Sequence, residues 1–187
     1  MTFLPTNYEA PTNAASTRYT KFKIGSTRLR IIGDSEKGTV VFGWEGWKED
    51  EEGKPSPRRF PMREKPSNGV FRDKIKHFWA FLAWNCDESR LQICHVTQRS
   101  VQDSIKELIK DDDWGDPHDY DMVIDRQGES LETTYNVIPK PKAPLDEQAI
   151  EVIREELPKI RLDALFTNED PFEGLTANTE APAADPF

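Results

Sequence analysis

Apolar and polar residues alternate with a period of two in several short stretches of the chain, which is the pattern of half-buried β-strands. β-branched and aromatic residues dominate these stretches, and turn signals such as Gly33-Asp34 and the Cys-Asp-Glu-Ser run at 86–89 separate them. The pattern predicts strands at residues 28–32, 39–47, 74–85, 90–96, 121–125 and 131–138.

Two other stretches follow the 3.6-residue period of an amphipathic helix. The first begins after Thr97, which fits an N-cap. Its apolar stripe consists of Val101, Ile105, Leu108 and Ile109. The second, shorter helix is predicted at residues 146–157. Residues 48–73 have neither period and predict a long loop, a feature that is usually functional or disordered.

The order of these elements predicts a mainly β (α+β) protein, an OB-fold-like barrel of five to six strands with one internal helix. The same order also fits another small barrel. We expect a disordered N-terminus at residues 1–17 and one OB-fold domain at residues 18–142. Residues 143–187 are expected to form a proline-rich linker, a short helix and a disordered acidic tail.

The net charge of −9 is unevenly distributed along the chain. Residues 18–110 contain 19 Lys and Arg against 13 Asp and Glu, whereas residues 143–187 contain 3 against 11. A basic body with an acidic tail is expected of a polyanion-binding domain whose tail competes for the same surface. Ordinary surface charge with a solubilising tail gives the same asymmetry.

The composition also bears on the compartment. No apolar run reaches the roughly 18 residues of a membrane span, and residues 1–16 lack the basic and apolar regions of a signal peptide. Cys86 and Cys94 do not make the disulfide framework of a small secreted protein, so reduced thiols are the simpler expectation. We therefore expect a soluble, intracellular protein.

Aromatic residues on the predicted strands are the first candidate site residues, because a single-strand binder stacks bases on rings and neutralises phosphates with cations. At 74–85, the set Phe78, Leu82 and Trp84 fits a core, which leaves Trp79 and Phe81 for stacking, and the reverse assignment also fits. Core packing remains the simpler role for any single ring. The stacking candidates are Trp44, Trp47, Phe60, Trp79 and Phe81.

Cationic candidates follow the first strand and the long loop. Arg58-Arg59-Phe60 places a ring inside a basic loop that could close as a lid over DNA, although the acidic run at 49–52 also fits a merely solvated loop. The candidates for phosphate contact are Arg28, Arg30, Lys48, Arg58, Arg59, Arg63, Lys65, Arg72, Lys74 and Lys76.

Neither a metal site nor a catalytic site is predicted. The chain has no closely spaced Cys or His pairs of the structural-zinc type, and Cys94 and His95 point to opposite faces of a predicted strand. An Asp-rich stretch at 111–125 could hold Mg²⁺ as in a nuclease, but no Lys or His stands beside it in a catalytic pattern. Walker, Gly-x-Ser-x-Gly and His-Glu-x-x-His motifs are absent, so we expect no cofactor and no enzyme activity.

The chain ends on Asp185-Pro186-Phe187, and the same triplet occurs at Asp170-Pro171-Phe172. A terminal carboxylate beside a phenyl ring suits a partner pocket with one basic residue and one apolar hole. This acidic tip resembles the tail of single-stranded DNA-binding proteins. The resemblance implies that the tip recruits replication and repair enzymes.

The central segment resembles the OB-fold single-stranded DNA-binding proteins of tailed bacteriophages. The aromatic strand and the Trp-Gly-Asp-Pro turn are its most specific features, and the resembling residues lie at 76–85, 91–101, 113–121 and 133–137. The resemblance implies an OB-fold that coats unpaired DNA through aromatic and basic residues without catalysis. Some phage members of the class hold zinc through His and Cys, and this chain does not match their ligand pattern.

Together these features predict a non-enzymatic protein that coats and protects single-stranded DNA in phage replication and recombination, in the cytoplasm of the infected bacterial host. Its tail would recruit partner enzymes and compete with DNA for the basic groove. The alternative is an OB-like adaptor that binds a host replication or transcription enzyme without touching nucleic acid. A third, more remote alternative is an Asp-rich metal nuclease.

Overall fold

The computed structural model describes residues 18–176, so the expectations for residues 1–17 and for Asp185-Pro186-Phe187 lie outside the described residues. The protein is mainly an antiparallel β-sheet with a few short helices, as expected. The strands are β1 (Gly25–Ile31), β2 (Val40–Glu49), β3 (Pro55–Pro61), β4 (Lys76–Asn85), β5 (Arg90–Val96), β6 (Met122–Gln127) and β7 (Thr134–Pro139). The helices are α2 (Arg99–Lys110), α3 (Glu147–Glu156), α4 (Ala164–Thr167) and α5 (Glu173–Thr176), with 3₁₀ turns η1 (Asn68–Val70), η2 (Ser130–Glu132) and η3 (Leu157–Lys159).

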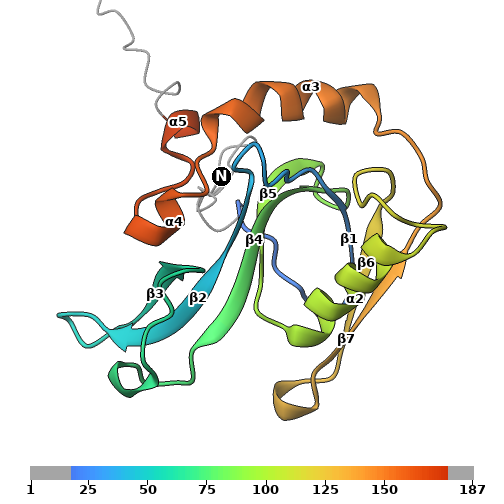
Figure 1. Ribbon diagram of the computed structural model, residues 1–187. Helices are drawn as coiled ribbons and strands as arrows, with labels where there is room; N and C mark the ends of the chain where they lie inside the picture. The colour runs from blue at the N-terminus through green and yellow to red at the C-terminus, as the bar shows by residue number, and fades with distance from the viewer. Residues whose placement is uncertain (1–17, 177–187) are drawn as a thin grey trace, which may run out of the picture.

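The sheet is open rather than closed into a barrel. Its strand order is β3-β2-β4-β1-β6-β7, with β5 paired on β4, and no pairing among the described residues joins β7 back to β5 or β3. Two strands pair along the same edge of the long strand β4. Strand β2 pairs with its first half, and β1 pairs with its second half. This arrangement bends the sheet around α2 (Figure 1). The expected closed OB barrel is therefore not confirmed.

Strand β3 lies inside the segment expected to be a long loop. Its sequence, Pro-Ser-Pro-Arg-Arg-Phe-Pro, does not predict a strand, because the three prolines have no backbone N–H to donate to a neighbouring strand. A proline-rich strand is tolerated at a sheet edge, and β2 is the only described strand that pairs with β3. The β2–β3 hairpin extends beyond the rest of the sheet (Figure 1).

Two cores lie on opposite faces of the sheet. Helix α2 covers one face, where Val101 and Ile105 pack with Phe81 and other buried residues of β1, β4 and β6. Helix α3 and the segment after it cover the other face, where Phe78 and Leu82 are buried. Both faces of β4 are thus covered over much of its length, which explains why its sequence is apolar at successive positions.

The C-terminal region does not begin as a free tail. Ala149, Leu162, Leu165 and Phe172 are buried against the sheet, so residues after 142 complete the second core. Phe172, from the internal Asp-Pro-Phe triplet, is only 4 % exposed. Its ring packs edge-on against Tyr19, and the Arg18 guanidinium lies 5.6 Å from its centroid. This internal copy of the triplet is therefore part of the second core.

No helix in residues 18–176 combines the length and apolar character that a bilayer crossing requires.

Candidate functional site

The sheet face covered by α2 carries a row of aromatic side chains beyond the helix. Antiparallel pairing places Phe42 of β2 opposite Trp79 of β4, and Trp44 opposite His77. The Phe42 and Trp79 rings meet edge to face with centroids 5.8 Å apart, and Trp44 and His77 lie 5.3 Å apart. Because side chains alternate between the two faces of a strand, Phe42, Trp44, His77 and Trp79 all lie on this face of the sheet. They form one continuous aromatic surface, called here the aromatic row.

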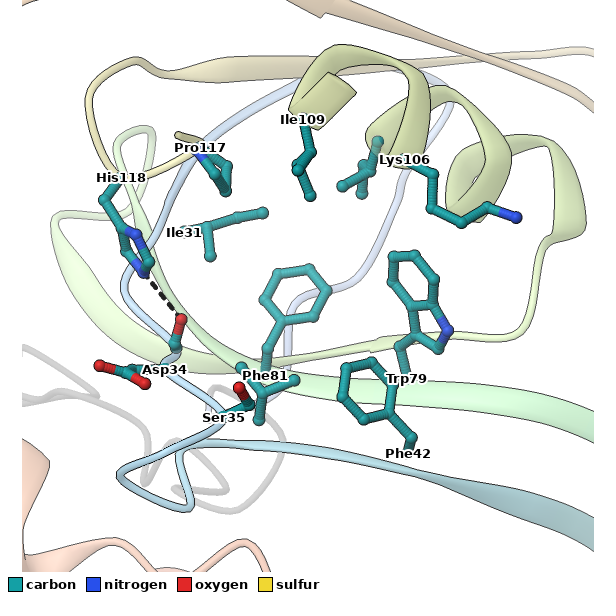
Figure 2. A pocket seen from close by; sticks show the side chains of 13 residues that line it. Ile31, Asp34, Ser35, Phe42, Trp79, Phe81, Lys106, Ile109, Pro117 and His118 are labelled. Carbon is teal, nitrogen blue, oxygen red and sulfur yellow. Dashed lines mark hydrogen bonds between the residues drawn. The ribbon is translucent and has the colours of Figure 1, made fainter. Parts of the chain in front are cut away.

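An apolar groove of about 410 Å³ opens beside the aromatic row, between the sheet and α2. Phe42, Trp79 and Phe81 form the sheet side of the groove, while Lys106 and Ile109 reach it from α2 (Figure 2). Phe42 is 40 % exposed, although large aromatic side chains are usually covered in a folded domain. The groove can thus accept a flat or apolar group against the exposed Phe42 ring and the half-buried Trp79 ring.

Hydrogen bonds fix the orientation of Trp79. Its indole Nε1 donates to Nε2 of His77 at 3.0 Å, and Nδ1 of His77 lies 2.8 Å from the Gly43 carbonyl oxygen. A carbonyl only accepts, so the proton of His77 is on Nδ1, and Nε2 is free to accept from the indole. Trp79 is therefore held in one pose before any ligand arrives.

Segment 62–75 packs over the far end of the aromatic row. The ammonium of Lys65 lies 4.3 Å from the Trp44 ring centroid, and the Trp44 indole donates to the Met62 carbonyl oxygen. Phe71 lies against Gly46 so closely that a Cβ at position 46 would be 2.6 Å from its ring. These contacts hold a cation directly over one of the rings.

Most of the predicted phosphate contacts remain available on the surface of the protein, although Lys76 shares the strand face of Phe78 and therefore lies on the side of β4 opposite to Trp79. Among residues 18–176 these side chains form no ion pair with an acidic group, and all are exposed except Arg58, which is half-buried. They are Lys48, Arg58, Arg63, Lys65, Arg72, Lys74 and Lys76. The acidic residues of the same hairpin and segment are Glu49 to Glu52 at the hairpin tip, Glu64 and Asp73.

Three predicted phosphate contacts are instead engaged in structural ion pairs. Arg30 is 3 % exposed, and its Nε bonds Asp121 at 2.7 Å while its other nitrogens donate to two backbone carbonyls. Arg28 pairs with the other oxygen of Asp121 at 2.6 Å, and Arg59 pairs with buried Glu45 at 2.8 Å. Because these guanidinium groups are already held in ion pairs with Asp121 and Glu45, we do not retain Arg28, Arg30 and Arg59 as phosphate contacts.

The predicted stacking residues divide in a similar way. Trp44 and Trp79 lie in the aromatic row, and Phe60 extends the row as the residue opposite Trp44 on β3. Phe81 is 3 % exposed and forms only the floor of the groove, so it presents no free ring face. Trp47 is exposed, but its odd spacing from Trp44 places it on the opposite sheet face.

The candidate residues missed from sequence are Phe42, Phe71, Lys106 and Ile109. A signal existed for Phe42, because it shares a strand face with Trp44. Ile109 continues the apolar stripe of α2 but is 46 % exposed at the groove. No sequence signal identifies Phe71 or Lys106, since their placement depends on how a loop and a helix pack on the sheet.

Neither thiol supports a reactive or metal-binding role. Burial raises the pKa of Cys86 to about 11, and it raises the pKa of fully buried Cys94 further. Both cysteines are free, and within the described part of the chain no three His, Cys, Asp or Glu side chains gather as metal ligands would. The Asp-rich stretch that suggested Mg²⁺ thus forms no such cluster at its described positions.

Comparison of the chain with protein-family models, with curated proteins and with solved structures found no match.

Proposed function

We propose that this protein binds single-stranded DNA without sequence preference and without catalysis. Bases would stack on Phe42, Trp79 and Trp44, and phosphates would lie along the cations of the β2–β3 hairpin and the segment after it. Coating of unpaired DNA during phage replication and recombination, and an OB-related origin of the open sheet, belong to the same proposal. They rest on the sequence resemblance alone.

The observation that carries the proposal is the aromatic row, in which Phe42 is exposed and Trp44 and Trp79 are half-buried. Rings held edge to face and through hydrogen bonds are already ordered, so a base that stacks on them costs little additional side-chain entropy. Each stacked base contributes about 1–3 kcal/mol, whatever its identity. Unpaired Lys and Arg beside the row supply the charge that single strands require.

The direct test is a titration of tryptophan fluorescence in the full-length protein with oligo(dT), with an abasic strand of equal length, and with duplex DNA. We expect quenching by oligo(dT), with an affinity that falls steeply as salt rises and exceeds the affinity for duplex. The abasic control separates stacking from phosphate contact. Equal binding of duplex, or of the abasic strand, would contradict the proposal.

A second candidate function is favoured by the composition of the groove wall. Ile31, Val40, Ile105 and Ile109 make most of it apolar, which also suits an apolar side chain of a protein partner. An adaptor of this kind would bind its partner with little dependence on salt and would show no fluorescence change with oligonucleotide. The titration described above therefore distinguishes the two functions.

A further inference from the structure

Within residues 18–176 the sheet has three edge strands, β3, β5 and β7, and of these only β7 is neither rich in proline nor covered by another segment. Edge strand β3 contains three prolines, which block pairing with another strand. The edge of β5 is covered by the N-terminal segment, where Ile93 exchanges backbone hydrogen bonds with Arg18 and Thr20. Among the strands that the structure describes, β7 pairs with β6 alone.

Hydrogen-bond alternation shows which groups of β7 point away from β6. The Lys140 amide donates to the Asp121 carbonyl at 2.8 Å, directly after the last ladder pair, Pro139 with Met122. Antiparallel neighbours alternate between bonded and non-bonded pairs, so the residues of β7 at even positions bond to β6. The N–H and C=O groups of Tyr135 and Val137 therefore point outward at the edge.

The side chains of β7 also favour pairing rather than opposing it. The strand reads Thr-Tyr-Asn-Val-Ile-Pro, with no charged residue and a high content of β-branched and aromatic residues. Tyr135 and Val137 pack toward the core under α2, while Thr134, Asn136 and Ile138 are exposed. An uncharged, exposed edge of this kind is a template for another strand.

We propose that a second copy of this chain pairs with β7 in an antiparallel, two-fold symmetric ladder centred on Asn136. In this register Tyr135 faces Val137 of the second copy, and both residues offer the outward N–H and C=O groups that such a pair exchanges. On the exposed face, Thr134 lies opposite Ile138 of the second copy and Asn136 opposite Asn136. The strand is thus complementary to itself, as an isologous interface requires.

The two-fold axis of this pairing is perpendicular to the sheet, so both copies of α2 lie on the same face. If the proposed DNA binding holds, the dimer presents two aromatic rows to one strand and binds long oligonucleotides more tightly than two separate sites would. The dimer itself does not depend on DNA binding. Dimerisation is measured without DNA, so a failure of the dimer proposal can be distinguished from a failure of the proposed function.

The test is analytical ultracentrifugation of the full-length protein over a range of micromolar concentrations without DNA. Wild type should shift from monomer to dimer as concentration rises. Asn136→Lys and Asn136→Glu should each weaken the dimer at least about tenfold, because like charges then face each other across the axis. An equimolar mixture of the two variants should recover it.

Ser26→Lys is the matched control, because Ser26 lies on the same exposed side of the sheet but on the inner strand β1. It should leave the dimer unchanged. A wild type that stays monomeric throughout the range would overturn the proposal. Equal dimerisation of wild type and both Asn136 variants, or no recovery in the mixture, would overturn it as well.

Discussion

At the scale of single residues, Phe42 combines exposure with a fixed pose. Its ring meets Trp79 edge to face and lines the groove, yet 40 % of it remains exposed, so its removal leaves no large cavity in the core. Substitution at this position should therefore weaken DNA binding without a large loss of folding stability. Sequence alternation put Phe42 and Trp44 on one face, but only the packing of α2 shows which ring borders the groove.

We expect Phe42→Ala to weaken oligo(dT) binding by about five- to 150-fold, the equivalent of one lost stacking partner at about 1–3 kcal/mol. Fluorescence titration measures the loss, and thermal unfolding should change little. The matched control is Leu131→Ala, because Leu131 is fully exposed on η2, away from the groove. Equal losses in both variants would argue against a stacking role for Phe42.

Arg30 shows the opposite behaviour, since its charge serves the fold. Arg30→Ala leaves buried Asp121 with one of its two cationic partners, and it should lower the free energy of unfolding by about 3 kcal/mol. Arg28→Ala, which removes the half-exposed partner of the same carboxylate, should cost about 0–1 kcal/mol. Urea unfolding measures both. A larger loss in Arg28→Ala would reverse the roles assigned to the two arginines.

The sequence shows that both arginines alternate with apolar residues on a strand, but it does not show that both of them pair with the same acid. Asp121 is distant in the sequence and reaches them only because β6 pairs with β1. Long-range pairing of this kind is why basic residues can be counted from sequence, while their availability for phosphate cannot.

At the scale of secondary-structure elements, Glu45 connects three strands. It lies on β2, accepts from Arg59 on β3 at 2.8 Å and lies 3.1 Å from the His95 ring on β5. Burial acts to raise the pKa of Glu45, but the hydrogen bonds and charges of His95 and Arg59 exceed this effect and lower it. The ionised carboxylate therefore stabilises the folded sheet.

Because the folded-state pKa of Glu45 lies below its unfolded value near 4.5, this stabilisation is complete at neutral pH. It is lost as pH falls from the unfolded value through the folded one. We expect the free energy of unfolding to decrease less between pH 6 and 3 in Glu45→Gln than in wild type, measured by urea titration at each pH. Glu64→Gln, at an exposed site, is the control and should follow wild type.

Element prediction from the sequence succeeded where one period dominated and failed where none did. Six strands and the two longer helices lie close to their predicted ranges. Strand β3 was missed because prolines and charges interrupt its alternation of apolar and polar residues. The order of the predicted strands did not show whether the sheet closes into a barrel. The N-cap of α2 is Gln98 rather than Thr97, and no side chain caps it.

At the scale of the whole molecule, the C-terminal region has to be divided differently from the sequence-based expectation. Residues up to Phe172 complete the second core, so a deletion from residue 143 would unfold the protein rather than test the tail. The 3₁₀ turn η3 and the four-residue helices α4 and α5 are too short to produce a periodic pattern of apolar residues. For this reason the sequence of this region resembles that of a disordered tail. A deletion of residues 177–187 tests the tail and keeps every residue of the two described cores.

This deletion removes Glu180 and Asp185 and moves the terminal carboxylate to residue 176. If the tail competes with DNA, the shortened protein should bind oligo(dT) a few-fold more tightly at low salt, and the difference should vanish at high salt because the competition is electrostatic. Fluorescence titration at two salt concentrations measures it. Unchanged affinity at low salt would remove the competing role from the tail.

The central claim is that unpaired bases stack on the sheet face beside α2. Ultraviolet cross-linking of the full-length protein to oligo(dT), followed by mass spectrometry of the peptides, tests its location directly. The account predicts adducts at Phe42, Trp79 and Trp44, and fewer of them at high salt. Adducts confined to the opposite face, around Trp47 and the C-terminal helices, or no adducts under conditions where the protein binds, would contradict it.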